Sequence, residues 1–497
     1  MGGNTHIIHR VNLEIEVPEM RLANQVKDDA VRLLYNEILP KLEKYMDTLV
    51  SDDEHIQLNQ LNINLENISA EHFEQEFTRL IVQAFNEKAE KLAEPLQLAN
   101  DQPNDEEVVK YTREQSALES FLFFLETGRL PWWSKKSGEL LDEQILSEII
   151  DHSSSEFQDR LISLLSGSSS VLDRLLNQYS LQFILRNIFQ HIFQHIFASV
   201  KVQQGFVKDT MTARFIGLLQ KLIERKKLVG LTLSKPLQIV VKRIISQIIS
   251  REGILSAQQL KNILDEFSAE FSFPDAEDQL EFELLIDEIR LNIKSTPVKN
   301  QQDSDFQETG KVIENQQKEI SKKTKKPEEE EEGIFADNAG LVLLHPFLSS
   351  FFADFELLVE GKFKDIESQT MAIHLLHYLA TKKELAPEYE LVLEKFLCGW
   401  DLDLPIAREV TISEEMKNES ETLLKAAIKH WSALKNTSPD GLREGFLQRE
   451  GKLILNGFQD RLIIESKAQD VLLSNLPWGY SIFKLPWMQS ALYVDWQ

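Results

Sequence analysis

The sequence predicts a mainly α-helical protein with small β elements near both termini and two halves that are joined by a charged linker. Glycine and proline, which interrupt helices, number only 19 and 15 among 497 residues, about 7% of the chain against a usual value near 12%. Apolar residues recur at helical spacing over long stretches, whereas short alternating stretches lie toward the two ends. These patterns favour helical domains over a fold built on one large sheet.

Residues 1–98 form the predicted N-terminal α/β region. Apolar and polar residues alternate from Val11 to Val17, which predicts a strand that ends at Pro18. Residues 22–49 carry one apolar helical face, and a second alternating stretch at 56–65 could pair with the first strand. Ser69, followed by an acidic turn, predicts the N-cap of a further helix.

Residues 110–293 form a predicted helical region after a polar, proline-containing loop near 95–110. A helix is expected at 119–126 and ends at Thr127-Gly128. No proline occurs from 132 to 235, and polar breaks near 153–155, 167–170 and Gly205 divide that stretch into consecutive helices.

Residues 294–333 form a predicted disordered, charged linker. Only five of these forty residues are apolar, and the segment ends in a lysine-rich run followed by Glu328–Glu332. So little apolar surface does not repay the entropy of ordering the chain.

The second half contains a predicted helical region at 334–438 and a C-terminal, tryptophan-rich α/β region at 439–497. Ser413 is the expected N-cap of one helix, and Pro405 marks a break between helices. After residue 441 the pattern becomes strand-like, with a hairpin expected from 452–456 and 460–466 around Gly457. A helical turn at 471–476 and short strands at 480–484 and 492–496 complete the prediction.

The charge balance excludes several classes of partner. Acidic side chains exceed basic ones, which gives a formal net charge of −26, whereas nucleic acids and anionic membranes are bound by basic faces. No apolar run is long enough to span a bilayer, and the N-terminus shows no secretory signal pattern. We therefore expect a chain that is made in the cytoplasm, binds no nucleic acid and does not insert stably into membranes. The single cysteine, Cys398, permits no internal disulfide.

The sequence gives no basis for an enzymatic activity. Glycine-rich phosphate loops, dinucleotide fingerprints and nucleophile elbows are all missing. His191 and His195 are four residues apart, a spacing that can place two imidazoles on one metal ion. The zinc-hydrolase pattern also needs a glutamate after the first histidine, and Ile192 stands there. We expect no catalytic residue, no cofactor and no metal site.

The tryptophans are the candidate interaction residues. The tripeptide Leu-Pro-Trp occurs three times, and proline holds each tryptophan at a stiff corner. Tryptophan is enriched at interface hot spots, although the same rings also pack domain cores. The candidates are Trp132, Trp133, Trp478, Trp487 and Trp496, and whether each packs the domain or docks a partner stays open at this point.

Four segments together resemble one family. They are Gly128-Arg-Leu-Pro-Trp-Trp133, Ala339-Gly-Leu-Val-Leu-Leu-His-Pro-Phe-Leu348, Gly441-Leu-Arg-Glu-Gly-Phe-Leu-Gln-Arg-Glu-Gly451 and Leu476-Pro-Trp-Gly-Tyr-Ser-Ile-Phe-Lys-Leu-Pro-Trp-Met488. This set resembles the tape measure proteins of extracellular, phage-tail-like contractile injection systems. His6-Ile-Ile-His-Arg10 and Leu61-Asn-Ile-Asn-Leu65 fit the same pattern.

The resemblance implies a non-enzymatic assembly protein that sets inner-tube length and docks at the baseplate hub. It implies tube and baseplate proteins as partners, assembly in the cytoplasm, and a place in the injection particle, with extracellular release left open. One alternative is an assembly chaperone or adaptor for tube or baseplate proteins. A second, from another class, is a cargo effector or metal-dependent hydrolase that uses His191 and His195.

Overall fold

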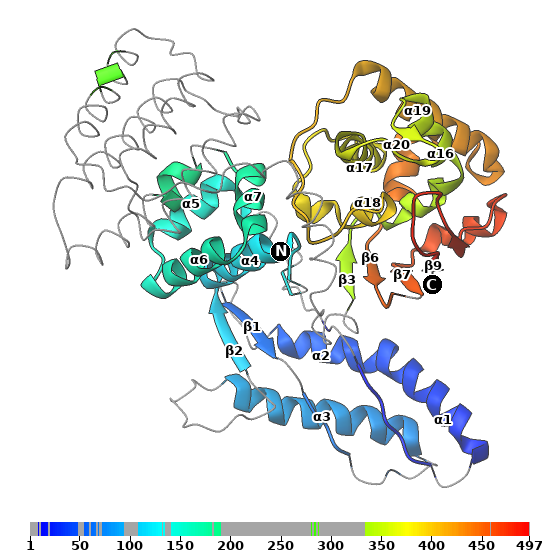
Figure 1. The fold of residues 1–497 in the computed structure, drawn as a ribbon. Helices are drawn as coiled ribbons and strands as arrows, with labels where there is room; N and C mark the ends of the chain where they lie inside the picture. The colour runs from blue at the N-terminus through cyan, green and yellow to red at the C-terminus, as the bar shows by residue number, and fades with distance from the viewer. Residues whose placement is uncertain are drawn as a thin grey trace. The chain divides into compact units, whose positions relative to one another are not determined.

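A computed structural model gives the fold of the chain (Figure 1). It describes residues 8, 11–17, 20–47, 54–58, 61–65, 68, 72–93, 108–131, 133–134, 141–180, 183–189, 280, 283–284, 287, 333–457 and 459–496. The chain divides into two compact units, Met1–Ser120 with Pro131–Leu141 and Phe121–Leu130 with Asp142–Gln497. The described residues are predominantly helical, so the predicted mainly α fold class is confirmed.

The first unit is built around helices that pack side by side (Figure 1). They are α1 (Met20–Leu33), the π-helical turn η1 (Leu34–Ile38), α2 (Leu39–Met46) and α3 (Phe73–Ala93). Their facing sides bury Ala30, Leu33, Leu34, Ile38, Leu42, Phe77 and Ile81 in one small core. The helix predicted at 22–49 is therefore present, with a π-helical turn in its middle.

A two-stranded antiparallel sheet completes the first unit. Strand β1 (Glu54–Leu58) pairs with β2 (Val108–Thr112), and Ile56 lies opposite Lys110. The strand predicted at 11–17 is wrong, because those residues form neither helix nor strand in the structure. The second alternating stretch does supply a strand, but its partner is β2 from the end of the expected loop. Local alternation predicts an extended backbone without specifying which strand it pairs with.

The second unit begins with a set of short helices. They are α5 (Glu143–Asp151), α6 (Ser155–Gly167), α7 (Ser169–Gln178) and the π-helical η4 (Ile184–Phe189). The last part of α4 (Arg113–Thr127), from Phe121 onward, also belongs to this unit. Side chains cap two of them: Asp142 accepts a hydrogen bond from the Gln144 N–H at 2.9 Å, and Ser154 accepts one from Phe157 at 3.3 Å. The breaks predicted near 153–155 and 167–170 are confirmed.

The rest of the second unit, residues 333–496, is called the C-terminal body below. Its helices are η5 (Ala339–Leu344), α16 (His345–Asp354), α17 (Ile366–Thr381), η6 (Glu388–Glu390), α18 (Val392–Leu397), α19 (Glu414–His430), η7 (Ser432–Leu434), α20 (Pro439–Leu442), η8 (Arg443–Leu447) and η9 (Ala468–Asn475). Ser413 accepts a hydrogen bond from the Met416 N–H at 3.2 Å, which confirms the predicted cap of α19. Acidic residues follow that cap and Lys429 precedes the end, as the helix dipole favours.

The C-terminal body also contains a five-stranded sheet. Its strands are β3 (Ile334–Ala336), β6 (Gly451–Ile454), β7 (Asp460–Ile464), β8 (Ile482–Phe483) and β9 (Leu492–Trp496), in the order β3-β6-β7-β9-β8. Only the β7–β9 pair is parallel, with Leu462 beside Val494. The predicted hairpin around Gly457 and the strands at both later positions are confirmed. A separate small hairpin, β4 (Leu358–Val359) with β5 (Lys362–Phe363), was not predicted.

The core of the C-terminal body joins this sheet to the helices. Leu341 to Leu344, Leu375, Leu376, Leu379, Leu462 and Leu492 are among its fully buried side chains. Most of the predicted linker 294–333, the break at Gly205 and most of the region 190–293 lie outside the described residues. The division of the chain into five regions therefore stays a prediction.

Candidate functional site

The C-terminal tryptophans are half-buried, and each uses its indole N–H within the body. Trp478 donates to the Leu343 carbonyl at 2.9 Å and meets Phe347 edge to face. Trp487 donates to the Leu397 carbonyl at 2.8 Å and packs beside Phe352 and Phe363.

Trp496 completes the set at the end of β9. It donates to Asp470 at 2.9 Å and lies beside Tyr480 and the guanidinium of Arg449. These contacts fix the orientation of each indole, and all three residues are only partly buried. A docking role for them stays a prediction.

The second predicted tryptophan site is only partly described. Trp133 stacks on Tyr111 with ring centroids 6.2 Å apart and an interplanar angle of 8°, within the first unit. Trp132 lies outside the described residues, as do His191 and His195. The structure therefore describes four of the five predicted tryptophans, Trp133 in the first unit and the other three in the C-terminal body.

Two further histidines, His374 and His377 on α17, are buried. His374 Nε2 lies 2.9 Å from the Ala407 carbonyl oxygen, and burial lowers its pKa to about 4. His377 lies 3.7 Å from the carboxylate of Glu394. Across the described ranges, no group of three or more His, Cys, Asp or Glu side chains is arranged to hold a metal ion. Burial also raises the pKa of the Cys398 thiol, which keeps it a small apolar side chain.

The motif segments of the second half converge in space. Gly340 packs so closely on the Phe446 backbone that a methyl group there would overlap the Phe446 carbonyl. The ring of His345 stacks on Phe483 at 4.4 Å, and Trp478 bonds to Leu343. The three motifs that start at 339, 441 and 476 therefore build one packed body. The contacts given for Gly340, His345 and Trp478 are packing contacts within this body.

Two arginines of the 441–451 motif are buried inside that body. Arg443 donates to the Leu379 carbonyl at 2.9 Å and pairs with Glu421 at 2.6 Å. Arg449 pairs with Asp470 at 2.6 Å and donates to the Gly445 carbonyl. Each buried guanidinium therefore contacts several elements at once. Removing its carboxylate partner would strongly destabilise the fold, because the charge would stay buried without a counter-charge.

A third buried arginine lies where α7 contacts the C-terminal body. Arg174 on α7 and Glu388 on η6 are both fully buried, with Arg174 Nε 3.1 Å from Glu388 Oε2. The other carboxylate oxygen of Glu388 accepts from Lys395 Nζ at 2.7 Å. Desolvation lowers the pKa of Lys395, and the charge of Glu388 partly offsets that effect. We call these three residues the ionic seam.

Backbone carbonyls complete the ionic seam. Arg174 donates to Leu125 at 2.6 Å, to Glu126 at 3.1 Å and to Asp403 at 2.7 Å. Lys395 donates to the carbonyls of Leu402 and Leu404 at 3.0 and 2.7 Å. Every charged group in the seam therefore has hydrogen-bond partners, which a buried charge requires.

The motif at 128–133 contributes directly to this seam. Gly128 ends α4 with φ +76°, and its N–H donates to the Phe124 carbonyl at 2.7 Å. The next residue, Arg129, pairs with Asp403 at 3.0 Å. The sequence identified this motif through its tryptophans, whereas the described contacts to the C-terminal body come from the glycine and the arginine.

Sequence reasoning missed the ionic seam, although a signal for it exists. Arg174 and Gln178 fall at helical spacing on the same face as Val171 and Leu175, and all four are buried. A charged and a polar residue in line with apolar ones indicate a buried polar contact. Nothing in the sequence indicates which residue would pair with Arg174.

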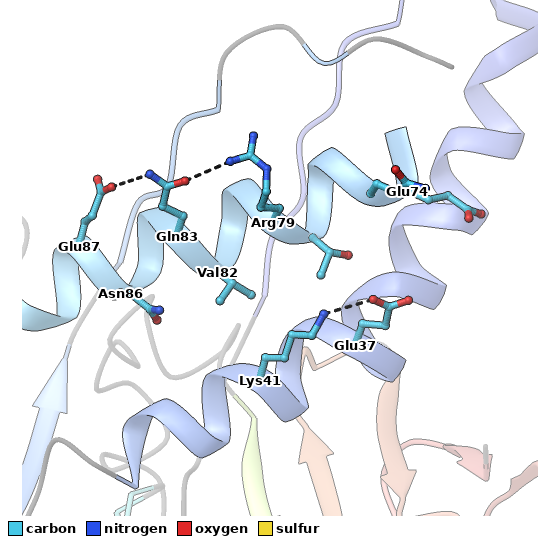
Figure 2. A pocket seen from close by; sticks show the side chains of 10 residues that line it. Glu37, Lys41, Glu74, Arg79, Val82, Gln83, Asn86 and Glu87 are labelled. Carbon is cyan, nitrogen blue, oxygen red and sulfur yellow. Dashed lines mark hydrogen bonds and ion pairs between the residues drawn. The ribbon is translucent and has the colours of Figure 1, made fainter. Parts of the chain in front are cut away.

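A groove of about 640 Å³ lies in the first unit between η1–α2 and α3 (Figure 2). Glu37 and Lys41 form one wall and pair with each other at 3.3 Å. On the other wall Arg79 donates to Gln83 at 3.3 Å, and Gln83 donates to Glu87 at 2.9 Å. Glu74, also on α3, pairs with Arg32 of α1. The labelled charged groups therefore have partners within the first unit, and the groove does not indicate a particular ligand.

None of the described helices is both long and apolar enough to cross a membrane.

In comparisons with known proteins, a family model described as contractile injection system tape measure protein matches residues 5–496. No curated protein and no solved structure matches the chain. The match covers nearly the whole chain and includes all of the motif segments.

Proposed function

The chain belongs to the contractile injection system tape measure protein family, and from that premise we propose that it sets the length of the particle's inner tube and docks at the baseplate hub. The observation that carries the proposal is the family match over residues 5–496. As a family member the chain is a structural component of a phage-tail-like injection particle. We propose that it acts without catalysis.

A helix-rich chain of this length suits a ruler. At about 1.5 Å per residue, a fully helical chain of 497 residues would span roughly 750 Å. The C-terminal body has a large buried core, so we assign the length-setting role to the part of the chain before it. The charged segment 294–333 would then serve as the linker between the ruler and the folded end.

The C-terminal body is the proposed docking end. Trp478, Trp487 and Trp496 are held by internal hydrogen bonds, so binding would order few additional side-chain torsions. In the same body, Ile482 is 54% exposed on β8, which is an edge strand of the sheet. An exposed edge strand and partly exposed tryptophans suit a protein partner. The proposed second contact is at Trp132 and Trp133.

The proposed partners are inner-tube and baseplate proteins of the same particle. We propose that the chain joins them in the cytoplasm and remains in the finished particle, including after release from the cell. An assembly chaperone would bind the same proteins but leave before the particle is complete.

Two measurements on purified particles test this function. Particles assembled without the chain should have variable tube lengths or fail to form, because nothing would stop polymerisation at a set point. Quantitative mass spectrometry should find the chain at a fixed copy number per particle. Its absence from complete particles of normal length would contradict a resident ruler and favour the chaperone.

A further inference from the structure

We infer that the ionic seam is a latch that holds α7 and the end of α4 on the C-terminal body and lets these helices leave it as a unit while the body stays folded. This inference rests on the contacts within the second unit and does not depend on the length-setting role. It concerns Arg174, Glu388, Lys395 and the polar groups around them.

The two sides of the seam are each internally supported. On the helical side, Arg174 donates to the carbonyls of Leu125 and Glu126, at the negative end of α4. On the opposite side, Lys395 pairs with Glu388 and is held by two carbonyls of its own loop. The acceptor site is therefore built before Arg174 enters it.

This arrangement makes separation asymmetric. If α7 leaves, Glu388 and Lys395 remain together as a neutral pair inside the C-terminal body. Arg174 goes into water, where a guanidinium is readily hydrated and stays charged. Neither side is left with an unpaired buried charge, which is the usual large cost of breaking a buried ion pair.

Further hydrogen bonds join α7 to the C-terminal body. Gln178 donates to the Ile406 carbonyl at 2.8 Å and accepts from the Glu388 N–H at 3.0 Å. Arg408 donates to the Gln178 carbonyl at 3.0 Å. Water can replace each of these hydrogen bonds at small net cost. Phe124 meets Tyr389 edge to face across the same boundary. Most of these named contacts are hydrogen bonds, which water replaces when the helices separate.

Hydrogen exchange of the full-length chain tests the latch, with Arg174→Met as the variant. Methionine keeps much of the side-chain volume but removes the charge and its hydrogen bonds. Amides of α7 should exchange at least about a hundred-fold faster, because Arg174→Met leaves one Glu388 oxygen and the carbonyls of Leu125 and Asp403 without their donor in the closed state. Amides of β6, β7 and α17 should change by less than a few-fold.

Arg449→Met is the matched control. Arg449 is also fully buried and ion-paired, but its partners lie inside the C-terminal body. Its loss should accelerate exchange in β6 and β7 by a similar factor. Equal acceleration of α7 and β7 in Arg174→Met, or an unchanged α7, would overturn the latch.

The wild-type chain provides a second measurement that does not require Arg174→Met to fold. In urea below the unfolding transition, α7 amides should open with a lower free energy and a smaller urea dependence than β7 amides, because less surface is exposed. Identical free energies and urea dependences for both sets would show one cooperative unit and reject the inference.

Discussion

Gly128 lies directly against the carboxylate of Glu388, far along the chain on the opposite side of the ionic seam. A methyl group at Gly128 would overlap Glu388 Oε1 and lie 3.0 Å from Arg174 Nε. Its φ of +76° also disfavours any side chain. The absence of a side chain at Gly128 therefore lets the 128–133 motif approach the buried ion pair closely.

Replacing that glycine should weaken the seam specifically. Gly128→Ala should lower the opening free energy of α7 by about 3 kcal/mol or more, because backbone strain adds to displacement of a buried ion pair. Gly457→Ala is the control, since Gly457 has φ +75° but open space around its Cα. It should cost about 1 kcal/mol, and only near β6 and β7. Hydrogen exchange gives both values; equal losses would mean that the contact with Glu388 is unimportant.

His374 should make the C-terminal body sensitive to acid. Burial lowers its pKa from 6.5 to about 4, so between these pH values the unfolded chain binds a proton that the folded chain does not. Stability therefore falls as the pH drops through this window, by about 3 kcal/mol in total for this group.

Urea unfolding between pH 7 and pH 4 measures this contribution. His374→Gln, which can still donate to the Ala407 carbonyl, should show a pH dependence that is flatter by up to about 3 kcal/mol. His430→Gln, at an exposed position on α19, should behave like the wild type. The same slope in all three proteins would exclude His374 as the source.

The proposed docking end can be tested at an exposed side chain without disturbing the core. Ile482→Glu places a charge on the edge strand β8 and should reduce incorporation of the chain into particles at least roughly thirty-fold, as for loss of an interface hot spot. Leu385→Glu is the control, with Leu385 52% exposed and Ile482 54% exposed. It should assemble normally. Normal incorporation of Ile482→Glu would place the docking surface elsewhere.

Most helices and the C-terminal hairpin were predictable because their signals are local. Ser413 caps α19 and Gly128 ends α4 where the sequence indicates, since capping depends on residues within one or two turns. The hairpin around Gly457 follows from a positive-φ glycine between two alternating stretches.

Pairings between distant segments were not predictable. Val11–Val17 has the alternation of a strand but forms no strand pairing with the residues that the structure describes, whereas β3 is too short to show a pattern. The buried arginines, Arg174, Arg443 and Arg449, look like surface residues in the sequence because their carboxylate partners lie on other elements. Only the fold determines that a charge is buried and paired.

The most direct test of the length-setting role is the length of particles whose chain carries a duplicated block, residues 140–293. Electron microscopy should show tubes longer by about 230 Å if each added residue lengthens the ruler by the helical rise of about 1.5 Å. A deletion within the same block should shorten the tubes in proportion. Tubes of unchanged length in both variants, with the chain still present in the particles, would contradict the ruler and show that tube length is set by another component.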